Sequence, residues 1–215
     1  MAEVGNQEVE EISTSESLPP VSERLDKIVV LDQEYRGANF NPESLNPELD
    51  RKNREEVQKM IDAGELSSPD DYRSASLIFQ HGETSDDFSK AFELSLKSTK
   101  LGMPPFATLL AQSFDRLIIS LQQNKGIQNS EIKQRFGTQI MHEGTPYALD
   151  GQTNKKDLEL LAPNLVEGFS DKKPDEQQQV YQKLQSEWQG LSQGAKDETL
   201  NRIKNDLTQV KQSYS

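Results

Sequence analysis

The sequence predicts a mainly α-helical fold, with one compact domain of about five helices followed by a helical hairpin at the C-terminus. Two observations predict this fold. Apolar residues recur at spacings of three and four through most of the chain, which is the pattern of helices that bury one face. Capping residues, prolines and acidic residues stand where several of these stretches begin. No period of roughly 20 to 50 residues repeats, so a solenoid is not expected.

The first two helices are expected over 22–36 and 48–63, separated by an Asn- and Pro-rich stretch. One face of the first helix carries Leu25, Ile28, Val29, Asp32 and Arg36. One face of the second helix carries Asp50, Asn53, Val57, Met60 and Ile61, and Gly64 supplies a left-handed C-terminal cap. Both inner stripes therefore include polar residues.

The third helix is expected from Ser68-Pro69-Asp70-Asp71 to His81, and the fourth from Ser85-Asp86-Asp87 to Leu101. A capping serine, a proline at the first helical position and acidic residues near the positive end of the helix dipole favour these starts. The fifth and most apolar helix is expected over 106–123, with Asp115 and Arg116 in its middle. Residues 138–149 could then form a small β-hairpin or a packed loop.

Residues 151–173 are predicted to be a linker with at most a short helix near 158–161, and residues 174–215 a helical hairpin. The hairpin has two apolar stripes, Val180, Leu184, Trp188 and Leu191 on one helix and Leu200, Ile203, Leu207 and Val210 on the other. We expect loose tethering of this hairpin to the main domain, with binding of a protein partner or self-association through Trp188 and Leu207. Deletion of residues 174–215 is then expected to leave the main domain folded.

Composition limits the function classes. The 36 acidic and 24 basic residues give a net charge of -12, which disfavours nucleic acids and anionic membrane surfaces as partners. Residues 1–20 hold five glutamates and no lysine or arginine, which predicts a disordered acidic tail and is unlike a secretory signal peptide. The absence of cysteine excludes thiol catalysis and fits a cytoplasmic protein. No apolar run approaches the ~20 residues that a membrane span needs.

Several polar pairs stand where core residues are expected, so folding should gather them into one cluster. His81 is the candidate acid or base, because its unperturbed pKa is near neutrality, and the other candidate catalytic residues are Asp32 and Asp115. An aspartate on the second ring nitrogen would fix the histidine tautomer, and Asp32, Asp50 or Asp115 could each do this. The candidate ligand-binding residues are Gln33, Arg36, Asp50, Asn53, Gln80, Arg116, Thr138 and Gln139.

Each candidate also has a structural interpretation. Asp32 and Arg36 can form an ion pair within one helix, and His81 can cap a helix C-terminus. Asp115 and Arg116 can form a buried pair, or Arg116 can hold a carboxylate or phosphate. The stretch 134–139 can be a plain turn, or Gly137 can let Thr138 and Gln139 face a ligand. His142 is expected to be exposed.

No metal or cofactor is expected. Three aspartates and a histidine could hold a divalent ion, but H-E-x-x-H is absent and the arginines of the cluster oppose a cation. The glycine-rich loops of P-loop and Rossmann proteins and the G-x-S-x-G serine motif are also absent.

The ordered motifs resemble those of a bacterial family of small helical proteins, known only as a domain of unknown function. That pattern reads D-Q-x-x-R, D-x-x-N, a G-W-P-like turn, Q-H, D-R and Y-G-T-Q, and the resemblance covers 21–149. This chain departs from it at Phe136, where the family has tyrosine, at Gly64-Glu65-Leu66, and in an insertion over 127–133. If the tyrosine hydroxyl takes part in the family's chemistry, this chain has lost it. The resemblance implies a shared set of polar residues but no activity.

Two hypotheses follow. In the first, the cluster lines a pocket that binds a small polar or anionic ligand, with His81 acting by acid–base chemistry. In the second, the protein is a non-catalytic interaction module, the cluster is a structural hydrogen-bond network, and the C-terminal hairpin binds a partner. A concave opening that reaches His81 favours the first hypothesis.

Overall fold

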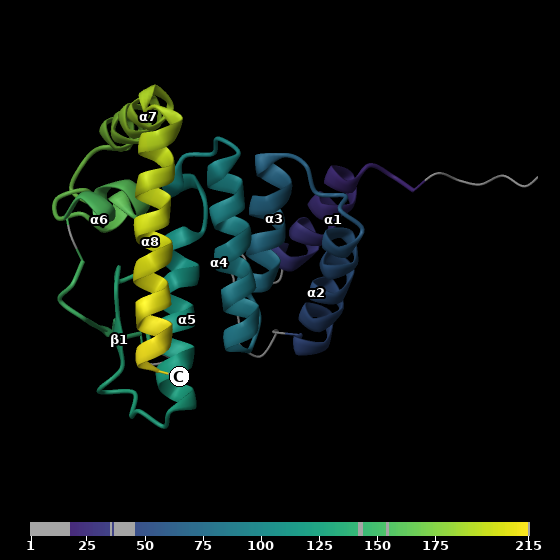
Figure 1. The fold of residues 1–215 in the computed structure, drawn as a ribbon, viewed down its shortest axis with the longest axis horizontal. Coiled ribbons are helices and arrows are strands. Elements are labelled where there is room, and N and C mark those ends of the chain that lie inside the picture. The colour runs from purple at the N-terminus through teal and green to yellow at the C-terminus, as the bar shows by residue number, and fades with distance from the viewer. Residues whose placement is uncertain (1–17, 35, 37–45, 142–143, 154, 215) are drawn as a thin grey trace, which may run out of the picture.

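The protein is a row of packed helices that runs from α1 and α2 at one end to α6, α7 and α8 at the other (Figure 1). The computed structural model describes residues 18–34, 36, 46–141, 144–153 and 155–214. The predicted mainly α fold is confirmed, with five helices before residue 125 and two more at the C-terminus. The predicted acidic tail and His142 lie outside the described residues, apart from the tail's last residues 18–20.

The first four helices begin and end close to the predicted positions. They are α1 (Val21–Glu34), α2 (Pro47–Asp62), α3 (Pro69–Gln80) and α4 (Ser85–Lys100). The side chains of Ser68 and Thr84 each accept a hydrogen bond from the backbone N–H of the third residue of the following helix, and the carboxylates of Asp71 and Asp87 accept one from the backbone N–H of the cap residue. These reciprocal capping boxes fix where α3 and α4 start.

The middle of the chain differs from the prediction in two places. The expected helix over 106–123 is a 3₁₀ turn, η2 (Pro105–Ala107), followed by α5 (Leu110–Asn124). The expected hairpin over 138–149 is reduced to one antiparallel bridge, Ile140 to Pro146. The strands are instead β1 (Lys133–Gln134) and β2 (Ala148–Leu149), which pair in parallel. The polar loop between them is held by hydrogen bonds to the side chains of Asp115 and Gln134.

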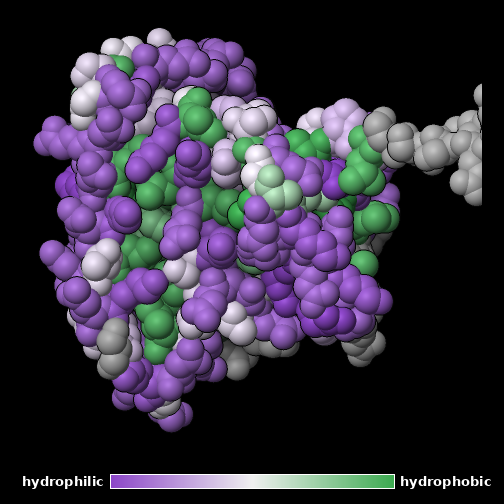
Figure 2. Space-filling model, turned by 45° about the vertical axis from the view of Figure 1, so that its right-hand side comes forward, coloured by the Kyte–Doolittle hydropathy of each residue, from purple (hydrophilic) through white to green (hydrophobic). Residues whose placement is uncertain are grey.

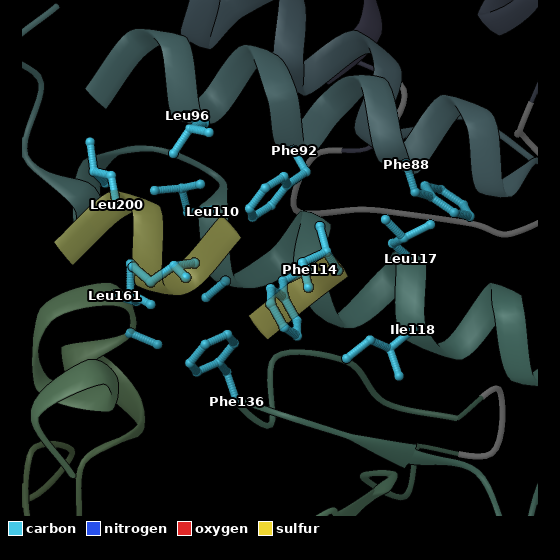
Figure 3. Close-up of a cluster of buried hydrophobic side chains, with 14 of the residues drawn as sticks. Phe88, Phe92, Leu96, Leu110, Phe114, Leu117, Ile118, Phe136, Leu161 and Leu200 are labelled. Atoms are coloured by element: carbon cyan, nitrogen blue, oxygen red, sulfur yellow. The ribbon is translucent and has the colours of Figure 1, made fainter. Parts of the chain in front are cut away.

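Two hydrophobic clusters make up the core, and α4 contributes to both. Its residues Phe88, Phe92 and Leu96 face α5 and the C-terminal helices, whereas Ala91 and Leu94 pack with α1, α2 and α3. In the larger cluster, the Phe114 ring lies edge-on to those of Phe92 and Phe136, with centroids 6.0 and 5.3 Å apart (Figure 3). Helix α4 is therefore buried on two sides.

The C-terminal segment completes the larger cluster. It contains α6 (Lys155–Leu161), the 3₁₀ turn η3 (Pro163–Leu165), α7 (Pro174–Gly190) and α8 (Gln193–Ser213). Trp188, Leu200, Ile203 and Leu207 are buried in the same cluster as Phe114. Ion pairs of Arg202 with Asp157 and of Arg135 with Asp206 add polar contacts to α8.

These contacts correct two expectations. The two C-terminal helices are present as predicted, but they are not loosely tethered, because α8 lies along α5 and α7 crosses its end (Figure 1). Trp188 and Leu207 are 1% and 5% exposed, so they are not available for self-association. The predicted linker is also part of the core, since Leu161, Ala162 and Phe169 are buried. Among the described residues, no helix combines the length and apolar character that a bilayer span requires.

We predict that Trp188→Ala lowers the free energy of unfolding by about 3–5 kcal/mol, because it removes a fully buried indole from the main core. Urea denaturation followed by circular dichroism measures this change. Leu191→Ala is the matched control, since that side chain is 41% exposed, and we expect a change within ~0.5 kcal/mol. If Trp188→Ala were as stable as Leu191→Ala, the result would contradict the packing of the C-terminal helices on the core and support loose tethering.

Candidate functional site

The ends of α1, α2 and α3 meet beside the middle of α5 around one open cavity of about 540 Å³. Its polar lining residues include Gln33 and Arg36 after Asp32, Asp50 from the first turn of α2, His81 at the C-terminus of α3, and Arg116 from α5. The sequence interpretation singled out all of these residues. The cavity gives a ligand direct access to His81.

Arg36 links α1 to α2 through two carboxylates. Its Nη1 atom lies 2.6 Å from Oδ1 of Asp32, and its Nη2 atom lies 2.6 Å from Oδ2 of Asp50. Asp32 and Asp50 are both buried. A charge that is removed from water needs such close partners, because otherwise its desolvation is not offset. The pair predicted from the i,i+4 spacing therefore points inward and includes a third residue from the next helix.

His81 is oriented by Asp32. The Nδ1 atom of His81 lies 2.8 Å from Oδ2 of Asp32, which also accepts a 2.7 Å hydrogen bond from Nε2 of Gln33. An ionised carboxylate can only accept, so Nδ1 carries the proton in this pair. In the neutral histidine the Nε2 atom then has a free lone pair, and none of the described residues bonds to it. This is the arrangement by which an aspartate prepares a histidine for proton transfer.

The pKa of Asp32 reflects two opposing effects. Burial raises the pKa of this carboxyl group, but the hydrogen bond and charge of His81, the Gln33 amide and the Arg36 charge outweigh burial. The pKa is lowered from 3.8 as a result. Asp32 is therefore ionised near neutral pH, as the proton on Nδ1 of His81 requires.

Arg116, the second arginine of the cavity, is held by neutral groups among the described residues. Its Nη1 donates to the carbonyl oxygen of Gln80, its Nε lies 3.1 Å from Oε1 of Gln139, and its guanidinium lies 5.6 Å from the centre of the Phe88 ring. In the described part of the chain, no carboxylate lies at ion-pair distance from it. Burial and the nearby positive charge of Arg36 both lower the pKa of Arg116. These contacts hold the side chain but do not neutralise it.

Asp115 points away from the cavity, which corrects its predicted place beside His81. It accepts hydrogen bonds from the backbone N–H groups of Arg135, Phe136 and Thr138, and from the Thr138 hydroxyl, at 2.8–2.9 Å. Burial raises the pKa of this carboxyl group, and the four hydrogen bonds oppose that shift. Asp115 therefore anchors the loop after β1 and is not placed for catalysis.

Thr138 and Gln139 connect this anchor to the cavity without lining it. The Gln139 Nε2 atom donates to the Thr138 hydroxyl over 3.1 Å, and its Oε1 accepts from Arg116. Gln134, fully buried, holds the backbone of Gln139 with both ends of its amide. A chain of hydrogen bonds thus runs from Asp115 through the loop to Arg116. Gln139 is thus fixed by the loop through Gln134, and its side chain orients the Arg116 guanidinium at the cavity.

Asn53 and Gln80 are buried and do not line the cavity. Nδ2 of Asn53 and Oε1 of Gln80 have no hydrogen-bond partner among the described residues, although both side chains are at most 7% exposed. Buried polar atoms without partners are uncommon in folded proteins. Both residues were predicted to bind a ligand, and their side chains do not line the cavity directly.

Sequence reasoning missed two residues near His81. Arg54 lies 3.3 Å from the His81 carbonyl oxygen through Nη1 and 3.5 Å from Asp87 Oδ1 through Nε, so it ties α2 to the α3–α4 turn. Gly82 lies so close to Asp87 that a Cβ atom would be 2.2 Å from the Cβ of Asp87. A glycine directly after the Q-H pair was the available signal. Among the described residues, no group of three His, Asp or Glu side chains could hold a metal ion.

No protein-family model, curated protein or solved structure matches the chain. The candidate site is therefore assigned from its own geometry and charges. The family resemblance of the ordered motifs stays a prediction.

We predict that Asp32→Asn destabilises the protein at neutral pH and not in acid. Because the pKa of Asp32 is lower in the folded state than in the unfolded state, its stabilisation is present above the unfolded value near 3.8 and is lost as the pH falls through the folded value. We expect a loss of about 1–3 kcal/mol at pH 7 that shrinks below pH ~4. Urea denaturation at a series of pH values measures it.

Asp26→Asn is the matched control, because Asp26 is exposed on the same helix. Its effect should be small at every pH. A loss in Asp32→Asn that stays constant down to pH ~2 would contradict the ionised pair.

Proposed function

We propose that the cavity binds a small anionic ligand, carrying a carboxylate or phosphate group, and that His81 exchanges a proton with this ligand. The observation that carries the proposal is Arg116, a cavity-lining guanidinium with no carboxylate partner in the described chain. An unneutralised cation away from bulk water is costly, and an anion would offset that cost. We further propose that the protein works in the cytoplasm.

The guanidinium also suits the shape of such a ligand. Arginine presents several N–H groups in one plane, which match the two oxygens of a carboxylate or phosphate. In Arg116, the Nε and Nη1 atoms are held by Gln139 and Gln80, whereas no described residue bonds to Nη2. Arg36 cannot serve equally well, because Asp32 and Asp50 already occupy its two Nη atoms. Arg36 instead keeps the wall of the cavity in place.

His81 supplies the proton-transfer group. Asp32 holds Nδ1, so Nε2 can accept a proton from a ligand, and Asp32 then stabilises the positive imidazolium. Gln33 and Asp50 line the same cavity and offer polar groups that would orient the ligand.

Kinship with the bacterial family of unknown function is part of the same proposal. Its support is spatial, because D-Q-x-x-R, D-x-x-N, Q-H and D-R each contribute a side chain to one cavity. D-R does so through Arg116, while Asp115 holds the Y-G-T-Q-like loop. Phe136 stands at the tyrosine position and is buried in the core beside Phe114. The loss of that hydroxyl therefore does not remove a group from the cavity.

The second candidate function is the non-catalytic interaction module with a structural network. The doubly paired Arg36 favours it, since those three residues connect α1 with α2 without any ligand. The two candidates differ in Arg116 and His81. A structural network needs these side chains for stability, and a binding site needs them for affinity and turnover.

We predict that Arg116→Gln weakens binding of small anions by roughly 10- to 100-fold, because a charged hydrogen bond contributes about 1.5–3 kcal/mol. Thermal shift against small carboxylates and phosphates identifies a ligand, and calorimetry measures its affinity. Arg116→Lys keeps the charge and should retain part of the affinity. Arg51→Gln, at an exposed and ion-paired arginine of α2, should change nothing. Ligands that bind equally well to Arg116→Gln would contradict the proposal.

We predict that His81→Ala abolishes turnover of such a ligand and costs only about 1 kcal/mol of stability, because Asp32 keeps its contacts with Gln33 and Arg36. Nuclear magnetic resonance of the ligand measures turnover, and urea denaturation measures stability. His142→Ala, at the other histidine of the chain, is the control. A large loss of stability with ligand affinity intact would favour the structural network.

A further inference from the structure

A second cavity, of about 280 Å³, lies between α4 and α8 and has an unusual charge for this chain. Its walls include Phe92, Leu96 and Leu207, which are buried members of the main core. Four lysines surround it: Lys97 and Lys100 from α4, and Lys204 and Lys211 from α8. Figure 2 shows hydrophobic surface between hydrophilic side chains on the side of the molecule that holds α8. We call this feature the lysine groove.

The charge of the lysine groove is opposite to that of the protein. The chain carries a net charge of -12, yet the groove has four lysines and one acidic residue, Glu93. No carboxylate of the described residues lies at ion-pair distance from Lys97, Lys100 or Lys204, whereas Lys27 and Lys59 on other helices are paired. Lys97 instead lies 5.7 Å from the centre of the Tyr72 ring. The positive charges of Lys97, Lys100 and Lys204 on one surface attract an acidic partner.

We propose that the acidic N-terminal segment of the same chain, residues 1–17, occupies the lysine groove. This segment has five glutamates and no lysine or arginine. Its central stretch, Glu8-Val9-Glu10-Glu11-Ile12, alternates acidic with branched apolar residues. The glutamates match the lysines, and Val9 and Ile12 match the apolar walls. Elsewhere in the chain, no stretch of 17 residues that lacks lysine and arginine contains five acidic residues.

The connecting chain is long enough for this contact. Helix α1 packs on α3, and α3 packs on α4, so the start of α1 is about two helix spacings from the groove, or roughly 20 Å. Residues 12–20 can span about 30 Å when extended. The segment therefore reaches the groove without any change in the helices. Its binding is electrostatic and exposed, so it weakens as salt screens the charges.

Zero-length carbodiimide cross-linking of the full chain tests this contact, because it joins carboxylates and amines only where they touch. Mass spectrometry of the digest should find residues 1–17 joined to Lys97, Lys100 or Lys204. Lys155 and Lys183, which are exposed on other helices, are the matched controls. We expect at least a several-fold excess of groove links over control links, falling several-fold in ~0.5 M salt. Equal linking to the controls would overturn the proposal.

Charge reversal provides a second measurement. The triple variant E8K/E10K/E11K should lose the links, and so should the triple variant K97E/K100E/K204E. Combining both sets should restore them, now from groove carboxylates to the segment's lysines. Mixing isotope-labelled and unlabelled chains separates the two sources of the segment. Links only between different chains, or no restoration in the combined variant with an unchanged melting transition, would overturn occupation by the chain's own segment.

Discussion

The two-sided burial of α4 is the constraint on which the fold and the candidate site depend. One face packs Phe88, Phe92 and Leu96 against α5, and the other packs Ala91 and Leu94 against α1–α3. These contacts fix α3 and α5 on either side of one helix. The end of α3 and the middle of α5 then come close enough for Arg116 to bond the carbonyl oxygen of Gln80. His81 and Arg116 face one cavity for this reason.

Charge satisfaction separates the structural residues from the candidate functional ones. Asp115 accepts four hydrogen bonds and has no exposure, so it can stabilise a loop without any ligand. Arg36 is neutralised by two carboxylates. Arg116 has hydrogen bonds to neutral groups but no carboxylate partner among the described residues, and the nearby Arg36 adds repulsion. A fold selected for stability alone would favour an apolar or neutral residue there, because replacing imperfectly paired charges is often stabilising.

Local patterns predicted the helices well because caps and apolar stripes act within one turn. Ser68 and Thr84 cap their helices through contacts of three residues, so α3 and α4 start where expected. The inward direction of Asp32 also followed from its phase with Leu25. The opposite directions of Asp115 and Arg116 could not be predicted, since adjacent residues on a helix differ by about 100° and either could face the core. The partners of Asp115 come from a loop about 20 residues later.

The C-terminal helices show a different limit of the sequence pattern. An apolar stripe such as Leu200, Ile203 and Leu207 establishes that a face is buried, but it does not identify the surface that buries it. Pairing of the two stripes with each other was one solution, and packing on the α4–α5 pair is the observed one. Residues 151–173 looked polar on average, although Leu161, Ala162 and Phe169 are buried. The average polarity of a short connecting segment therefore does not predict whether the segment packs into the core.

Helix α4 contributes to the lysine groove and contacts the candidate site through Phe88, whose ring lies against the Arg116 guanidinium. The next residue is Ser89, whose Oγ atom accepts a 3.1 Å hydrogen bond from Nζ of Lys211 at the groove. Energetic coupling between two sites needs an element with two alternative arrangements that both sites bias. The structure shows α4 in one arrangement, capped at its start and buried on two sides. Charge changes in the groove should therefore leave anion affinity at Arg116 unchanged, apart from weak and salt-screened long-range electrostatics.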